Sequence, residues 1–182
     1  MNLPKRFILN KKPKSYLEQG KINCGTYVLK SIISTYKNKN YSPGIIKQLL
    51  LSLPIFIKKE LERYGFKAKI LRASNLNDTI KLSLIKKELK NSKPVILYVR
   101  SSYSRKGEEH KIRSYLVGHY ISILGYDDNL KVFFIYDPLR SKEYQEKLPI
   151  GNVSRSYKKI LEDWKDPIYG KFMNFLYIPI SK

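Results

Sequence analysis

The chain has 182 residues, 42% of them hydrophobic and 13% aromatic, which is enough to bury one sizeable core, and we predict a single domain over residues 1–182. One cysteine and two histidines exclude an internal disulfide and a cysteine-based zinc site, and no cofactor is expected. The net charge of +21, from 36 basic and 15 acidic residues, allows an anionic partner. Because the basic residues are mostly scattered lysines without arginine-rich runs, nucleic acid is a less favoured partner.

Neither a membrane span nor an export signal is indicated. The longest apolar stretch, Ile45 to Ile57, is interrupted by Lys47, Gln48 and Pro54, and it falls short of the roughly 18 to 20 residues that a spanning helix needs. The first residues lack the apolar segment of a signal peptide, so a cytoplasmic location is expected, and export of a processed form remains open. Residues 1–14 are predicted to form an extended, basic lead-in with a short edge strand at Phe7–Leu9.

The only cysteine lies at the start of the best amphipathic pattern. From Tyr27 onward, apolar residues recur at three- and four-residue spacing and predict a helix of about three turns. Asn23 is then the expected N-cap, with its side-chain oxygen accepting a backbone N–H, and Cys24 lies at the positive end of the helix dipole. That position favours the nucleophilic thiolate. A small, inert hydrophobe at the buried start of a helix is the alternative.

Helices in the first half of the chain followed by strands in the second half predict an α+β fold. Ser42, as N-cap before Pro43, predicts a second helix with an apolar face between Ile45 and Leu53. The later elements are predicted as a helix at Ile55–Tyr64, a strand at Phe66–Leu71, a helix at Asp78–Leu89, strands at Val95–Val99, His119–Tyr126 and Lys131–Tyr136, a helix at Ser154–Trp164 capped by Ser154, and a strand at Phe175–Ile178.

A predicted hairpin brings a histidine and an aspartate together. If residues 127–129 form a three-residue turn, His119 lies directly opposite Asp137 on one face of the sheet. The aspartate can then accept the Nδ1 hydrogen of the imidazole and leave Nε2 free for a thiol. The Cys24 helix is expected to lie on the same face, which also carries four apolar residues: Ile121, Ile123, Phe133 and Ile135.

These residues supply each role that thiol catalysis needs. Cys24 is the candidate nucleophile, His119 the base and later the acid, and Asp137 the residue that orients the imidazole. The side-chain amide of Gln19, together with the Cys24 backbone N–H, is the candidate oxyanion hole.

The order of these motifs resembles that of the papain-like cysteine peptidases. The shared order is Gln19, then Cys24-Gly25 on a helix, then Gly118-His119-Tyr120 opening a strand, then Asp137-Pro138 after the next strand. Within these peptidases it most resembles the C39-like group, in which an aspartate follows the histidine. The resemblance implies a papain-like fold with a helical N-terminal half packed on an antiparallel sheet, and cleavage of a peptide or related amide through a thioester acyl-enzyme.

Two other functions are compatible with the same residues. An acyl transferase would use the same site, with an amine replacing water in the second step. A basic, non-catalytic binding module would owe its function to the lysine-rich surface and leave Cys24 idle. For the peptidase, we expect a peptide or protein substrate, with acidic segments favoured by the basic residues of the long polar loop Ser101–Leu116, which are Arg105, Lys106, Lys111 and Arg113. Nothing in the sequence indicates the oligomeric state.

Overall fold

The computed structural model describes residues 3–20, 23–110, 117–165 and 172–182. The helices are α1 (Cys24–Lys37), α2 (Ile45–Leu50), α3 (Pro54–Arg63), α4 (Asp78–Lys90), the 3-10 helix η1 (Lys142–Tyr144) and α6 (Tyr157–Trp164). The strands are β1 (Arg6–Ile8), β2 (Lys67–Ala68), β3 (Leu71–Arg72), β4 (Val95–Arg100), β5 (Gly118–Asp127), β6 (Val132–Tyr136), β7 (Val153–Ser156) and β8 (Leu176–Ser181).

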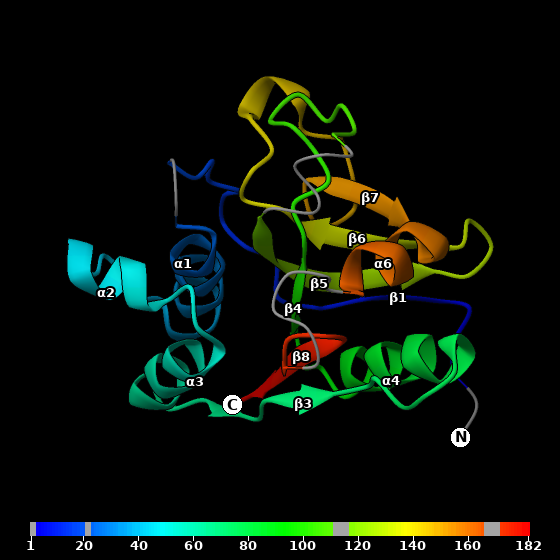
Figure 1. Ribbon diagram of the computed structural model, residues 1–182, viewed down its shortest axis with the longest axis horizontal. Helices are drawn as coiled ribbons and strands as arrows, with labels where there is room; N and C mark the ends of the chain where they lie inside the picture. Colours follow the sequence, from blue (N-terminus) through cyan, green and yellow to red (C-terminus); the bar gives the residue numbers. More distant parts are fainter. Residues whose placement is uncertain (1–2, 21–22, 111–116, 166–171) are drawn as a thin grey trace.

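The strands form one antiparallel sheet in the order β2-β8-β4-β5-β6-β7, with β1 paired to β5 and β3 paired to β8. Figure 1 shows α1, α2 and α3 grouped on one side of the molecule and α4 and α6 on the other. The predicted α+β class, with a helical first half packed on an antiparallel sheet, is confirmed. Among the described helices, none combines the length and apolar character of a membrane span.

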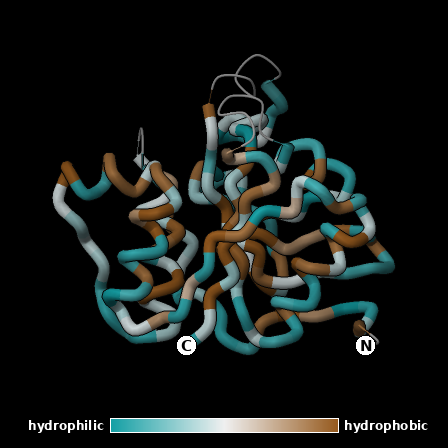
Figure 2. Tube along the Cα trace, turned by 60° about the horizontal axis from the view of Figure 1, so that its bottom comes forward, coloured by the Kyte–Doolittle hydropathy of each residue, from teal (hydrophilic) through white to brown (hydrophobic). Residues whose placement is uncertain are grey.

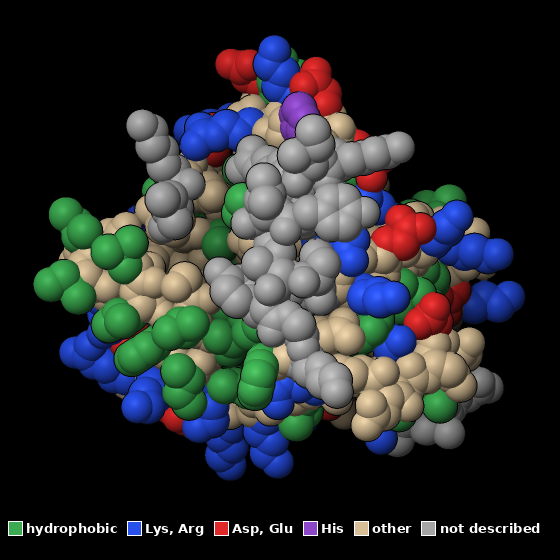
Figure 3. Space-filling model, in the orientation of Figure 1, with side chains coloured by type: hydrophobic (Ala, Val, Ile, Leu, Met, Phe, Trp, Pro, Cys, Tyr) green, Lys and Arg blue, Asp and Glu red, His purple; other side chains and the backbone are tan. Residues whose placement is uncertain are grey.

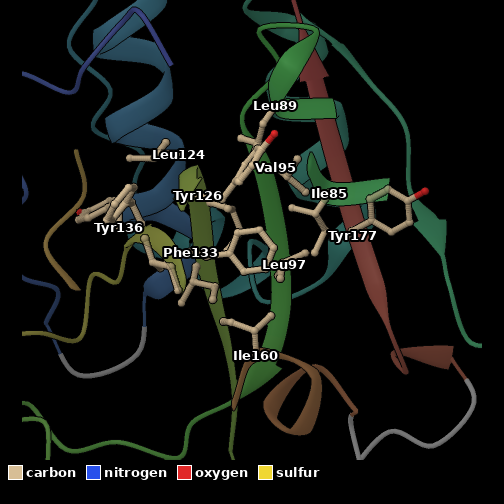
Figure 4. Packing of buried hydrophobic residues seen from close by; sticks show 14 of the residues in the cluster. Ile85, Leu89, Val95, Leu97, Leu124, Tyr126, Phe133, Tyr136, Ile160 and Tyr177 are labelled. Atoms are coloured by element: carbon tan, nitrogen blue, oxygen red, sulfur yellow. The ribbon is translucent and has the colours of Figure 1, made fainter. Parts of the chain in front are cut away.

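Two clusters of buried apolar residues hold these layers together. Side chains alternate across a strand, so neighbouring residues of β4 enter different clusters. Val95 and Leu97 pack with residues of α4 and α6, such as Ile85 and Ile160, as Figure 4 shows. Ile96 and Tyr98 pack with α1 and α3 instead. In Figure 2 the apolar segments accordingly gather between the layers and the polar segments lie mostly at the periphery.

The face on which α1 packs was predicted wrongly. The apolar stripe of α1 contacts the cluster that contains Tyr98 and Tyr120, whereas Ile121 and Ile123 belong to the cluster on the other face. Both faces of β5 are apolar and buried, so the pattern of this strand alone did not indicate which layer covers which face.

Several element boundaries also differ from the predicted ones. Gly44, and not Ser42, is the N-cap of α2, so Pro43 lies outside the helix. The strand predicted at Phe66–Leu71 is instead two short strands, β2 and β3, and both pair with β8. Ser154 lies in strand β7, which was not predicted, and α6 is capped by Ser156, whose side chain accepts a hydrogen bond from the Lys159 N–H.

The β5–β6 hairpin has a longer turn than predicted. Asp127 faces Val132, so four residues, 128–131, connect the strands, and Lys131 adopts a left-handed φ of 53°. The register then shifts by one residue at a β-bulge between Ile123 and Gly125, and Asp137 is not directly opposite His119. Because Ser122 faces Tyr136, continuing the register by one residue places Asp137 diagonal to His119 on the same face, where a long side chain can still reach it.

Candidate active site

Cys24 is the first residue of α1, and the residue as a whole is partly exposed. Asn23 occupies the N-cap position as predicted, but its side chain makes no capping hydrogen bond; its amide nitrogen instead donates to Gln48 Oε1 in α2 at 3.1 Å. This bond fastens α2 beside the start of α1. The backbone N–H groups of that first turn lie at the end of the helix where its dipole is positive, and the Gly25 backbone is hydrogen-bonded to the Cys24 sulfur.

The glycines beside the two candidate catalytic residues are required by close approaches. A Cβ on Gly25 would lie 2.3 Å from the Leu51 carbonyl oxygen, so a side chain there would separate α2 from the start of α1. A Cβ on Gly118 would lie 1.6 Å from the Tyr98 hydroxyl oxygen. These two glycines thus allow the close packing on which the positions of Cys24 and His119 depend.

His119 lies on a part of β5 that has a neighbouring strand on one side. β4 pairs with the whole segment from Gly118 to Ile123, whereas the described pairing with β6 begins only at Ser122. The start of α1 fills the other side: the Cys24 sulfur receives a hydrogen bond from the Tyr120 backbone and is hydrogen-bonded to the imidazole of His119. The edge of the strand therefore brings the thiol and the imidazole together.

Asp137 lies beyond the end of β6 and is buried with His119. Its Oδ1 is 2.7 Å from His119 Nε2 and accepts a hydrogen bond from the Leu139 N–H at 2.9 Å. The structure thus joins Cys24, His119 and Asp137 in one hydrogen-bonded chain. The ring nitrogens are exchanged relative to the prediction, because Nε2 and not Nδ1 faces the carboxylate.

The pKa shifts of Cys24, His119 and Asp137 all favour the charged form of each side chain. Burial raises the pKa of the Cys24 thiol, but the hydrogen bond and charge of His119 outweigh burial, and the net pKa is lowered. Burial lowers the pKa of His119, but the charge and hydrogen bond of Asp137, followed by those of Cys24, raise it to about 9. Burial raises the pKa of Asp137, but the charges of His119 and Arg155 hold it far below its usual range. At neutral pH this favours a thiolate beside an imidazolium and an ionised aspartate.

In an NMR experiment, we expect the chemical shifts of the His119 ring protons to report a pKa of about 9, above the ordinary imidazole pKa of about 6.5. Asp137→Asn removes the negative charge that raises the pKa, so it should move this titration to lower pH. Because the folded pKa is raised, the stability that His119 contributes is complete below about pH 6.5 and is lost as the pH rises through about 9.

In a His110→Gln variant, His119 is the one histidine left in the sequence, so the imidazole NMR signal can be assigned to it. His110 is exposed in the polar loop that follows β4, and it does not belong to the hydrogen-bonded group of Cys24, His119 and Asp137. A His119 titration near the ordinary imidazole pKa in this variant would contradict the charged pair.

Two residues that the sequence analysis did not single out hold Asp137 in place. The Asn152 side chain accepts a hydrogen bond from the Asp137 N–H at 2.8 Å and donates one to the Asp137 carbonyl at 2.9 Å. Arg155, on β7, donates to the second carboxylate oxygen of Asp137 and lies 3.9 Å from Asp163 Oδ2. Residues 152–156 were predicted as a loop and the start of a helix, and the short alternation Val153-Ser154-Arg155-Ser156 was the only local sign of β7.

Gln19 is buried beside the same segment. Its backbone N–H donates to the carbonyl of Pro138, the residue after Asp137, at 2.7 Å. Its side-chain oxygen is buried without a hydrogen-bond partner among the described residues. This unpartnered atom is an acceptor, whereas the candidate role in an oxyanion hole uses the amide N–H groups of Gln19 as donors.

The polar loop after β4 fastens the Gln19 segment. Arg105 donates to Glu18 Oε1 at 2.7 Å and to the Gln19 carbonyl at 3.2 Å, so it is not free to bind an acidic substrate as the sequence suggested. Lys111 and Arg113 lie outside the described residues. Within the described part of the chain, no cluster of three or more His, Cys, Asp or Glu side chains could hold a metal ion.

The model of the family described as Peptidase_C39 like matches residues 27–163, well over half of the chain and a range that contains His119 and Asp137. The chain belongs to this family. No curated protein matches it.

Three solved structures share the fold of this C39-like chain. The peptidase domain of Streptococcus ComA, described as a bi-functional ABC transporter involved in a quorum-sensing pathway, has a TM-score of 0.55 at 16% identity, covering 92% of this chain and 98% of that chain. A double glycine motif protease from an AMS/PCAT transporter, solved in complex with the leader peptide, has a TM-score of 0.52 at 14% identity and 97% coverage of both chains. A C39-like peptidase from Bacillus anthracis has a TM-score of 0.52 at 16% identity, covering 97% of this chain and 98% of that chain. Family and fold together support a cysteine peptidase function.

Proposed function

We propose that this chain is a thiol hydrolase that cleaves a peptide or related amide with Cys24, His119 and Asp137 as its catalytic triad. The hydrogen-bonded chain from the Cys24 sulfur through His119 to Asp137, at the N-terminus of α1, is the observation that carries the proposal. The lowered pKa of Cys24 supports a thiolate nucleophile, and the raised pKa of His119 supports an imidazolium that can donate its proton.

In the first step the Cys24 thiolate attacks the substrate carbonyl carbon and forms a C–S bond. The oxyanion that results accepts hydrogen bonds from the first turn of α1 and the Gln19 amide. As it collapses, the C–N bond breaks, and His119 gives its proton to the leaving amine. This step leaves a thioester and a neutral imidazole held in place by Asp137.

In the second step His119 takes a proton from water, and the oxygen attacks the thioester carbon. The C–S bond breaks, the carboxylic acid leaves, and the thiolate–imidazolium pair is restored. An amine in place of water would make the enzyme an acyl transferase through the same steps. The leader peptide bound to the AMS/PCAT protease supports a peptide substrate for this chain.

Thiol labelling tests the nucleophile directly, because Cys24 is the only cysteine of the chain. An ordinary thiol has a pKa of about 8.5 and is mostly protonated at pH 6.5, whereas a thiolate paired with imidazolium stays reactive. We expect the native chain to react with one equivalent of iodoacetamide at least about tenfold faster than the denatured chain at this pH. His119→Ala should remove most of this advantage.

Cleavage is tested by incubating the wild-type chain with a complex peptide mixture and detecting new termini by mass spectrometry. New termini should require Cys24 and be absent with Cys24→Ala. Labelling no faster than in the denatured chain, together with no cleavage, would favour a basic binding module with an idle cysteine. Fast labelling with amine incorporation instead of cleavage would favour the acyl transferase.

A further inference from the structure

The segment that contains α2 exposes an unusual amount of apolar surface. No residue of α2 is buried, and the side chains of Ile45 and Ile46 are each 78% exposed. We call the six exposed aliphatic side chains of this segment the α2 apolar surface; they are Ile45, Ile46, Leu49, Leu50, Leu53 and Ile55. Figure 3 shows apolar side chains gathered on the side of the molecule where α2 lies in Figure 1.

The opposite side of this segment is attached to the fold and keeps the apolar surface facing outward. Leu51 is 1% exposed in the core, Gln48 accepts the hydrogen bond from Asn23, and the Ser52 carbonyl accepts one from the Tyr120 hydroxyl at 3.0 Å. The exposed apolar side chains thus lie on a segment that is attached to the fold by its other side. Contiguous exposed apolar surface of this kind is typical of an interaction site.

Positive charge accompanies the apolar surface. Residues 37–63 contain six basic residues and only two acidic residues. Both acidic side chains are already paired, Glu60 with Lys47 at 2.7 Å and Glu62 with Lys58 at 2.8 Å. Lys39 and Lys59 are exposed in the flanking stretches. In Figure 3, Lys and Arg side chains border the lower edge of the apolar side chains, where few acidic side chains are visible.

From these observations we infer that the α2 apolar surface binds the surface of a membrane that contains anionic phospholipids. Protruding aliphatic side chains enter the boundary between headgroups and acyl chains, while neighbouring lysines contact the anionic headgroups. A second copy of the chain is a poorer occupant, because the two surfaces would carry like charge and each whole chain has a net charge of +21. Two cavities elsewhere on the described surface, one beside Tyr36 and Phe66 and one beside Lys37 and Arg63, are not lined by any of the six side chains, and a protruding surface suits a bilayer better than a groove-bound peptide.

Membrane binding at this surface would place the catalytic cysteine next to the bilayer. Asn23, the residue before Cys24, is bonded to Gln48 of α2, and the start of α1 touches the Leu51 carbonyl. Peptides that lie on or near a membrane would then be the accessible substrates. The binding itself does not depend on the proposed catalytic chemistry and can be tested without a substrate.

Vesicle sedimentation with the full chain tests the inference. Vesicles of phosphatidylcholine alone are compared with vesicles containing about one third phosphatidylglycerol at roughly physiological ionic strength. We expect the wild-type chain to partition at least tenfold more strongly onto the anionic vesicles. The double variant Ile46→Gln/Leu49→Gln should lose at least tenfold of this partitioning, because its net charge is unchanged and only apolar contact is removed. Lys39→Gln/Lys59→Gln should bind more weakly and become less sensitive to salt.

A matched control uses exposed aliphatic side chains elsewhere. Leu130, 67% exposed in the β5–β6 turn, and Ile80, 44% exposed on α4, are replaced in Leu130→Gln/Ile80→Gln, which should bind like the wild type. Circular dichroism and thermal unfolding establish that each variant is folded. Equal binding by both glutamine double variants, or equal binding to both kinds of vesicle, would overturn the inference. The inference would also be overturned if the wild-type chain bound neither kind of vesicle. In that case, a loss of self-association in the α2 variant would assign the surface to a second copy, and a loss of peptide cleavage would assign it to the substrate.

Discussion

Replacing His119 with alanine is expected to lower kcat/KM for peptide cleavage by roughly 10²- to 10⁴-fold, a loss second only to that of Cys24→Ala. His119 is the hydrogen-bonded neighbour of the thiol, and its raised pKa of about 9 keeps a proton available for the leaving amine. Its removal takes away the acid and the base, and it also takes away the charge that lowers the pKa of Cys24. The rate is measured on a peptide whose Cys24-dependent cleavage has been established.

The comparison with Asp137 separates proton transfer from orientation. Asp137→Asn should lower the rate less than His119→Ala, because the imidazole remains and a nearly isosteric group can still contact it. Asparagine is preferable to alanine here, since it removes the charge but keeps a side-chain oxygen that can accept a hydrogen bond from the buried Arg155. His110→Ala, which alters an exposed loop residue, is the matched control and should leave the rate nearly unchanged. A larger loss from Asp137→Asn than from His119→Ala would contradict the assigned roles.

Replacing Arg155 with methionine is expected to destabilise the fold by about 3–5 kcal/mol, which corresponds to a fall in Tm of roughly 10 °C. The Arg155 side chain is 5% exposed and faces two buried carboxylates, those of Asp137 and Asp163. The guanidinium carbon lies 4.4 Å from the centre of the Tyr103 ring, which covers it, so water cannot readily solvate the two carboxylates once the guanidinium is removed. Thermal and denaturant unfolding measure the loss.

The same substitution should also slow catalysis, because Arg155 is one of the groups that hold the Asp137 carboxylate toward His119. Arg155→Lys keeps the charge without the planar fork and should recover part of the stability but not the full rate. The matched control is Arg63→Met: its side chain is 69% exposed and 3.7 Å from Glu60, so it should change stability by no more than about 0.5 kcal/mol. A stable Arg155→Met variant with full activity would show that Arg155 neither supports the fold nor positions Asp137.

The sequence alone was sufficient for the features that local chemistry determines. The apolar period after Tyr27 predicted α1 with Cys24 in its first turn, because helical periodicity depends on residues only three or four positions apart. The apolar run Val95–Val99 predicted β4 for a similarly local reason. The motif order around Cys24, His119 and Asp137 indicated the C39-like family, to which the chain belongs.

Long-range packing decided what these local patterns leave open. The four-residue turn and the β-bulge between Ile123 and Gly125 together set the register that places Asp137 diagonal to His119, because a hairpin register depends on turn length and on bulges. Arg155 and Asn152 reach Asp137 only because β7 pairs with β6. This pairing joins segments that are distant in the sequence, so a local pattern does not predict it. Likewise, periodicity predicted an apolar face on α2 but not whether anything covers it. In the described structure that face lies open beside Cys24, because only the tertiary arrangement determines which apolar surfaces meet.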